Sequence, residues 1–142
     1  MDDILNIHKL YSCYATVHVN IDSFKSRADC DKVINIMKHY YESRKEFNLI
    51  LETKELKIEN ISTHCLYIFS SFLNSLKSNK YQYLKKTIIK IYNKYCYDLL
   101  YFMFVYLSSP IAIVEVILYR ENEDGTLSNI ERIKQYFPKK LK

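Results

Sequence analysis

The sequence predicts a single α/β domain, with a mixed, mostly parallel sheet of four or five strands and about four helices. Strand-like and helix-like segments alternate along the chain, an order typical of parallel strands joined by helical crossovers. The chain has 142 residues, of which 49% are hydrophobic and 26% charged, enough to bury the core of one globular domain. No composition shift, repeat or low-complexity linker divides it, so we expect residues 1–142 to form one domain.

The first half of the chain predicts two strands with a helix between them. Residues 14–21 alternate between apolar and polar side chains, the period of a strand with one face less buried than the other. Residues 4–10 are a candidate hairpin partner for this strand. A helix is expected over 26–44, with Asp29 as an acid in its first turn, and the apolar run 47–51 predicts a strand covered on both faces.

The middle of the chain predicts two further helices separated by a strand. An apolar stripe at helical spacing predicts a helix from Ser62 to about residue 76, and the segment TIIKIY at 87–92 predicts a strand. A third helix is expected over 93–107, because Pro110 prevents it from continuing.

The last part of the chain predicts one more strand and one more helix. Residues 112–119 are rich in β-branched side chains, as strands are, and the pair 124–125 then forms a turn. Ser128 and Glu131 have the spacing of a capping box, so a final helix is expected over 128–137.

The segment 99–119 approaches the length of a membrane span. Ser108, Ser109 and Pro110 divide it into halves of different periodicity, and Glu115 lies in the second half. These breaks favour a buried helix end followed by a strand, so we expect no membrane partner.

The formal net charge is +5, and part of the basic excess lies in the lysines that follow Pro138. A modest excess of this kind suits a solvated tail, whereas nucleic-acid-binding proteins usually carry a clustered basic face. We therefore expect no nucleic-acid partner. The abundance of Lys, Ile, Asn and Tyr indicates an A/T-rich genome, such as that of a low-GC eukaryote, a bacterium or a large DNA virus.

The cysteines predict a reducing compartment. Cys13, Cys30, Cys65 and Cys96 are far apart in the sequence, and the first residues do not resemble a secretory signal. Both features predict free thiols and a cytoplasmic location, which for a viral protein would be the virion or the host cytoplasm.

Residue type and spacing disfavour three classes of chemistry. Phosphate-binding loops need glycines, and the only glycine is Gly125 in a late turn. The cysteines and histidines lack the short spacing of metal ligands, so we expect neither a metal nor a cofactor. An enzyme would have to use His18 or a carboxylate among Glu52, Glu55 and Glu59. None of these has a partner at catalytic spacing, so we expect no catalytic residues.

One stretch of the chain carries a family resemblance. An apolar strand that ends at 50–52 leads through a turn to a helix start at Asn60 and Ser62. This order, within a hairpin followed by alternating helices and strands, resembles the STAS domain, a family of anti-sigma-factor-antagonist modules close in architecture to the SpoIIAA-like and CRAL-TRIO folds. The strand over 112–119 and a helix over 129–136 would match the family's ending.

The helix start of that family reads Asp-Ser-Ser-Gly, with a phosphoacceptor serine at the helix N-terminus. Asn60 falls on the acidic position and Ser62 on the phosphoacceptor, while Ile61 replaces the first serine and Thr63 the glycine. The resemblance therefore implies an interaction surface at Asn60, Ser62, Thr63 and Leu66, with Ser62 as the candidate phosphoacceptor. By residue type alone, Asn60 and Ser62 are also ordinary acceptors for the unpaired N–H groups of a helix start.

The resemblance implies a non-catalytic protein-interaction or regulatory module that docks through the helix start and face from Asn60 to Phe69. Its partner would be another protein or a second copy of the chain, and in a virus this would include a virion or assembly role. The alternative is a small-molecule or lipid carrier of CRAL-TRIO-like architecture, which requires an apolar cavity. The tyrosines around the third helix are expected to pack in the core and partly at the surface, with an exposed tyrosine-rich interface as the second interpretation.

Overall fold

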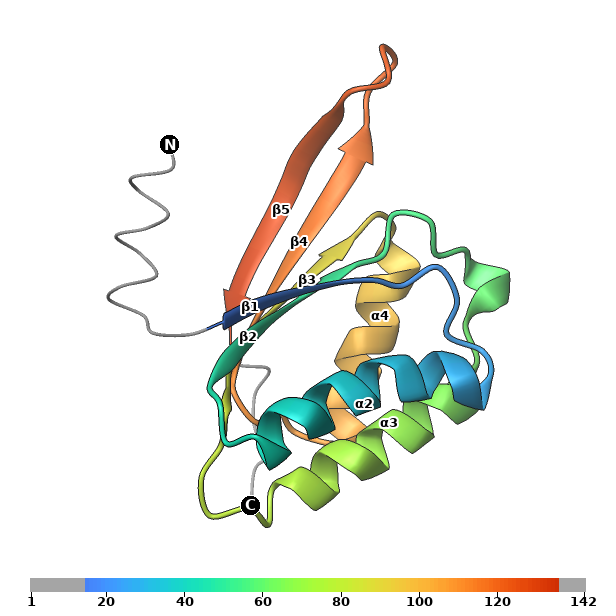
Figure 1. Ribbon diagram of the computed structural model, residues 1–142. Coiled ribbons are helices and arrows are strands. Elements are labelled where there is room, and N and C mark those ends of the chain that lie inside the picture. The colour runs from blue at the N-terminus through green and yellow to red at the C-terminus, as the bar shows by residue number, and fades with distance from the viewer. Residues whose placement is uncertain (1–14, 136–142) are drawn as a thin grey trace, which may run out of the picture.

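Five strands form one sheet, in which their spatial order follows the sequence (Figure 1). The computed structural model describes residues 15–135, and its strands are β1 (Ala15–Asn20), β2 (Phe47–Glu52), β3 (Leu84–Ile91), β4 (Ile113–Glu121) and β5 (Leu127–Gln135). The first four strands are parallel, and β5 pairs with β4 in the antiparallel sense. The α/β class and the mixed, mostly parallel sheet predicted from the sequence are therefore confirmed.

Within residues 15–135, three helices cover one face of this sheet. They are α2 (Arg27–Glu42), α3 (Thr63–Leu76) and α4 (Lys94–Phe102), and a short 3₁₀ turn, η1 (Ile58–Asn60), precedes α3. Because the parallel strands are arranged in sequence order, crossovers of the same hand place every helix on the same side. Figure 1 shows α2, α3 and α4 on that side, and within residues 15–135 no helix covers the opposite face.

The prediction of a final helix is wrong, because residues 127–135 form the strand β5. The preceding turn builds a hairpin: Gly125 has a φ of 89°, and the Asn122 N–H donates to the Thr126 carbonyl at 2.7 Å. An antiparallel neighbour satisfies the backbone groups along the outer edge of β4, whereas a capping box satisfies only the first N–H groups of a helix. Pairing across the sheet therefore overrides the local capping pattern. The predicted hairpin partner at 4–10 lies outside the described residues.

Strand β2 has one buried face and one half-buried face, so the prediction that it is covered on both faces is wrong. Every second residue is buried against the helices, namely Phe47, Leu49 and Leu51. The continuous apolar run suggested two covered faces, but the helices occupy only one side of the sheet.

The predicted helix over 93–107 is present but changes its hydrogen bonding partway. Asn93 caps α4 by accepting a hydrogen bond from the Cys96 N–H at 2.9 Å. A π-helical turn, η2 (Met103–Leu107), then follows α4 without a break. None of the helices among residues 15–135 has the length and apolar character to cross a membrane.

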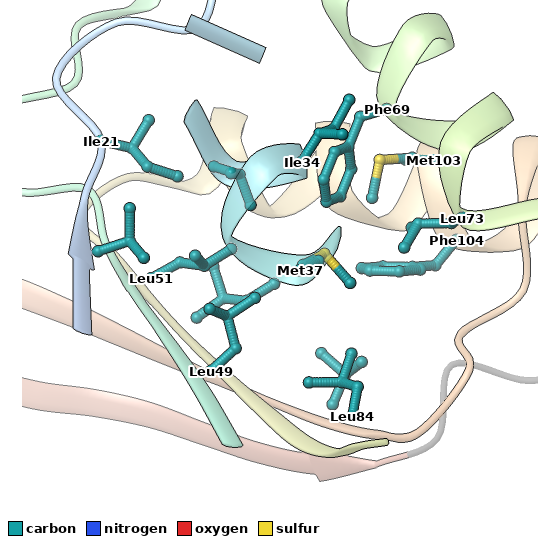
Figure 2. Packing of buried hydrophobic residues seen from close by; sticks show 14 of the residues in the cluster. Ile21, Ile34, Met37, Leu49, Leu51, Phe69, Leu73, Leu84, Met103 and Phe104 are labelled. Atoms are coloured by element: carbon teal, nitrogen blue, oxygen red, sulfur yellow. The ribbon is translucent and has the colours of Figure 1, made fainter. Parts of the chain in front are cut away.

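The hydrophobic core lies between the helices and the sheet. Figure 2 shows side chains from three helical elements converging there. Met37 of α2, Leu73 of α3, and Met103 and Phe104 of η2 lie above Leu49 of the sheet. Aromatic contacts extend the core, since Tyr40 stacks on Phe47 with ring centroids 4.7 Å apart. The core fixes the positions of the helices and therefore of the surfaces described next.

Candidate functional site

The starts of α2 and α3 are tied together at the carboxyl ends of β1 and β2. The Phe24 N–H donates to the Asn60 carbonyl at 2.8 Å, and the Ser62 N–H donates to the Phe24 carbonyl at 2.9 Å. Phe24 and Ile61 thus form an isolated parallel bridge between the two crossover loops. The backbone of Asn60 and Ser62 therefore holds two helix starts side by side.

Ser62 is the N-cap of α3. Its hydroxyl oxygen accepts a hydrogen bond from the His64 N–H at 3.1 Å, so this side chain satisfies one of the unpaired donors of the helix start. The hydroxyl is half-buried, while Thr63 and His64 beside it are exposed. The capping role expected from residue type is present in the structure.

The start of α2 carries a carboxylate that caps the helix, whereas the start of α3 has none. Asp29 forms a capping box with Ser26 and also accepts hydrogen bonds from the Lys25 N–H at 3.0 Å and the Ser23 hydroxyl at 2.8 Å. Hydrogen bonds from the backbone of Ser26 and Lys25, and then from Ser23, lower the pKa of the Asp29 carboxyl to about 2. The first turn of α3 contains no acidic residue.

Two residues of the expected docking segment point into the core instead of outward. Leu66 is only 6% exposed, and Phe69 is buried beside it. Cys65 is also buried, and its thiol donates to the Ser26 carbonyl at 3.3 Å. Burial raises the pKa of the Cys65 thiol, which keeps it protonated. Leu66 and Cys65 thus hold α3 against α2, and neither side chain reaches the surface.

The outward-facing side of α3 has an unusual composition. We define the α3 outer face as its exposed residues Thr63, His64, Tyr67, Ser71, Asn74 and Ser75. None of these is a Lys, Arg, Asp or Glu, although exposed helix faces ordinarily carry such charges. Tyr67 is 51% exposed, and Ile58, which precedes the helix in η1, is 48% exposed. The exposure of Tyr67 was predictable from the sequence, because Tyr67 lies opposite the apolar stripe of this helix.

The α3 outer face adjoins the helix that follows β3. The Asn74 amide donates to the Leu107 carbonyl at 3.3 Å, and the Ser108 hydroxyl donates to the Asn74 side-chain oxygen at 2.9 Å. The neighbouring turn η2 exposes Tyr106, which at 60% is the most exposed large hydrophobic residue described. Of the tyrosines around α4, none is buried in the core: Tyr92 and Tyr97 are half-buried, and Tyr95, Tyr101 and Tyr106 are exposed.

The residues considered for catalysis, His18, Glu52, Glu55 and Glu59, lie on two different parts of the molecule. Glu55 and Glu59 are exposed in the loop before α3, and His18 is exposed on the sheet face opposite the helices. Glu52 lies on that same face, where one of its carboxylate oxygens, Oε2, is buried without a hydrogen-bond partner among the described residues. Burial, and then the neighbouring Glu52 carboxylate, raise the pKa of Tyr92. No hydrogen bond or ion pair joins His18 to Glu52 in the described part of the chain.

Within residues 15–135, no group of three His, Cys, Asp or Glu side chains has the arrangement of a metal site. Cys30, Cys65 and Cys96 are free thiols, and all three are buried. Burial, followed by the nearby Cys65, raises the pKa of the Cys30 thiol to about 11.

An apolar cavity lies inside the core, between the helices and the sheet. Its volume is about 110 Å³, and its walls come from α2, α3, α4, η2 and strands β2 to β4. Native cores seldom contain voids much larger than a water molecule. Sequence periodicity places residues in the core but does not show whether they fill it.

Comparison of the chain with protein-family models, with curated proteins and with solved structures found no match.

Proposed function

We propose that this protein is an interaction module that docks through the α3 outer face. The observation that supports this proposal is the combination of two exposed apolar anchors, Tyr67 and Ile58, with a helix face that carries no Lys, Arg, Asp or Glu. Interface centres are depleted in charged residues and enriched in tyrosine, because tyrosine buries a large area at a low cost in side-chain entropy.

The occupant that this surface fits is a second copy of the chain. The protein has a formal net charge of +5, so two copies repel each other at most relative orientations. An isologous contact brings a patch against itself, and a charge close to the two-fold axis then meets its own equivalent. A face without formal charges avoids this repulsion, and its serine, threonine and asparagine side chains can hydrogen-bond across a two-fold axis.

The STAS likeness is part of the proposal at this site. It is supported by the crossover from β2 through η1 to α3, which leaves Ser62 at the helix N-cap where that family has its phosphoacceptor. The strand β5 replaces the helix expected at 129–136, so the likeness rests on the earlier elements alone. A regulatory role would follow if a phosphate on Ser62 altered the charge of the docking face. Three free thiols support a reducing, cytoplasmic setting.

Sedimentation velocity over a range of protein concentrations tests the docking proposal. The expected result is a reversible monomer–dimer equilibrium that Tyr67→Lys weakens at least tenfold, because the substitution places two like charges across the two-fold axis. Tyr95→Lys is the matched control, since Tyr95 is also an exposed helical tyrosine but lies at the start of α4. A protein that stays monomeric at high micromolar concentration, or a Tyr67→Lys variant that dimerises like the wild type, would overturn the proposal.

A further inference from the structure

The apolar cavity is a separate feature from the α3 outer face, and its walls define what it can hold. Apolar side chains from several elements line it, among them Val33, Leu49, Leu73, Met103 and Val114. The wall is apolar apart from two threonines, Thr53 and Thr87, and the Thr53 hydroxyl already donates to the Lys90 carbonyl at 2.7 Å. A bound water needs two to four polar partners, which this wall does not offer.

We infer that the cavity is a binding site for a small, uncharged, apolar molecule. A cavity of about 150 Å³ with similar walls binds benzene or xenon and stays dry without them. The volume here, about 110 Å³, suits a molecule of the same class with about five to seven non-hydrogen atoms. An acyl chain needs the several hundred Å³ of a typical ligand pocket, so the lipid carriage considered from the sequence stays a prediction.

Two features of the wall allow a ligand to enter and fit. Met37 and Met103 face the cavity from different elements, and the unbranched methionine side chain adapts readily to irregular spaces. Met103 also begins the π-helical turn η2, and such turns occur frequently at functional sites. Two groups of lining residues are only half-buried, so the cavity is partly open to the surface; they are Leu99, Leu100 and the segment 110–112 on one side, and Phe24, Leu56 and Ile61 on the other.

Benzene, a neutral probe of the right class, tests this inference with the full chain. In ¹³C-methyl spectra of the wild type, we expect saturable shifts of methyl groups in the cavity wall, and a rise in melting temperature with benzene concentration. Xenon under pressure should shift the same methyl groups. The absence of saturable shifts with both probes would overturn the inference.

Paired variants locate the binding. Leu73 and Leu76 are both buried on α3, but only Leu73 lines the cavity. Leu73→Phe should weaken benzene binding at least tenfold, whereas Leu76→Phe should retain it, with each variant compared against its own ligand-free melting temperature. Equal binding by the two variants would contradict the assignment.

A milder pair keeps the test decisive if the phenylalanine variants do not fold. Val114 and Val116 are both buried on the helical face of β4, and only Val114 lines the cavity. Val114→Ile should weaken binding several-fold, while Val116→Ile should leave it within about twofold of the wild type. The reverse order would overturn the inference. Both pairs are buried and leave the α3 outer face unchanged, so they test the cavity independently of the docking function.

Discussion

Single residues at the helix starts decide how the crossover loops are held. Ser62 caps α3 with its hydroxyl, while its backbone N–H and the Asn60 carbonyl bind Phe24 in the neighbouring loop. Ser62 thus has a capping role and a role in the junction between the two loops. The two roles can be separated by substitutions, because capping depends on the hydroxyl and the junction on the backbone.

Ser62→Ala should lower the free energy of unfolding by about 1 kcal/mol, because the His64 N–H loses its cap. Ser62→Asp should retain wild-type stability, since aspartate is an equally good N-cap and its charge is favourable at a helix N-terminus. Urea denaturation measures both effects. Ser71→Ala, on the exposed face of the same helix, serves as the control and should not reduce stability. A loss with Ser71→Ala as large as with Ser62→Ala would argue against a capping effect.

Asp29 makes stability depend on pH in the acid range. Its pKa in the folded protein, about 2, lies below the ordinary value of 3.8 expected in the unfolded chain. The ionised carboxylate therefore stabilises the fold above about pH 4, and this contribution is lost as the pH falls towards 2. Asp29→Asn should reduce the acid sensitivity of the melting temperature in this window, and Ser23→Ala, which removes one donor, should reduce it less. An unchanged acid profile in Asp29→Asn would contradict this account.

At the scale of elements, the β4–β5 hairpin is the clearest departure from the sequence prediction. The capping-box spacing of Ser128 and Glu131 is a real local signal, but the turn at Gly125 and the unpaired edge of β4 determine the outcome. Elements with strong periodicity, such as α2 and α3, were predictable because their own residues specify them. β5 depends on a neighbour in space, which periodicity does not reveal.

Gly125→Ala should destabilise the hairpin by about 1 kcal/mol, because alanine tolerates a φ of 89° poorly. No atom lies within 4 Å of the position that the new Cβ would take, so the backbone conformation alone causes the loss. Gly125→Asn should lose less, since asparagine adopts positive φ more readily. Thermal denaturation of the three proteins gives the ranking, and an alanine variant as stable as the wild type would indicate a different turn.

Strands β3 and β4 share an ion pair on the sheet face without helices. The Lys86 ammonium lies 3.1 Å from a carboxylate oxygen of Glu115, which is only 2% exposed. Lys86→Met should lower the free energy of unfolding by about 2 to 3 kcal/mol, because it removes a cation from a buried carboxylate that keeps its other contacts. The double variant Lys86→Met with Glu115→Leu should recover much of this loss. A double variant less stable than Lys86→Met would show that the pair does not act as a unit.

At the scale of the whole molecule, the one-sided placement of the helices follows from the strand order. The sequence predicted alternating elements, and hence parallel strands, but it contained no signal for which strands are neighbours. That order decides whether helices cover one face or two, and it leaves α3 with one side on the core and one side outward. The buried position of Leu66 and the exposed position of Tyr67 both follow from it.

Docking through the α3 outer face is tested most directly by amide chemical shifts recorded by NMR at increasing protein concentration. We expect shifts concentrated at Thr63, His64, Tyr67, Ser71, Asn74 and Ser75, and we expect them to disappear in Tyr67→Lys. Spectra that do not change with concentration, or changes confined to the sheet face opposite the helices, would contradict it.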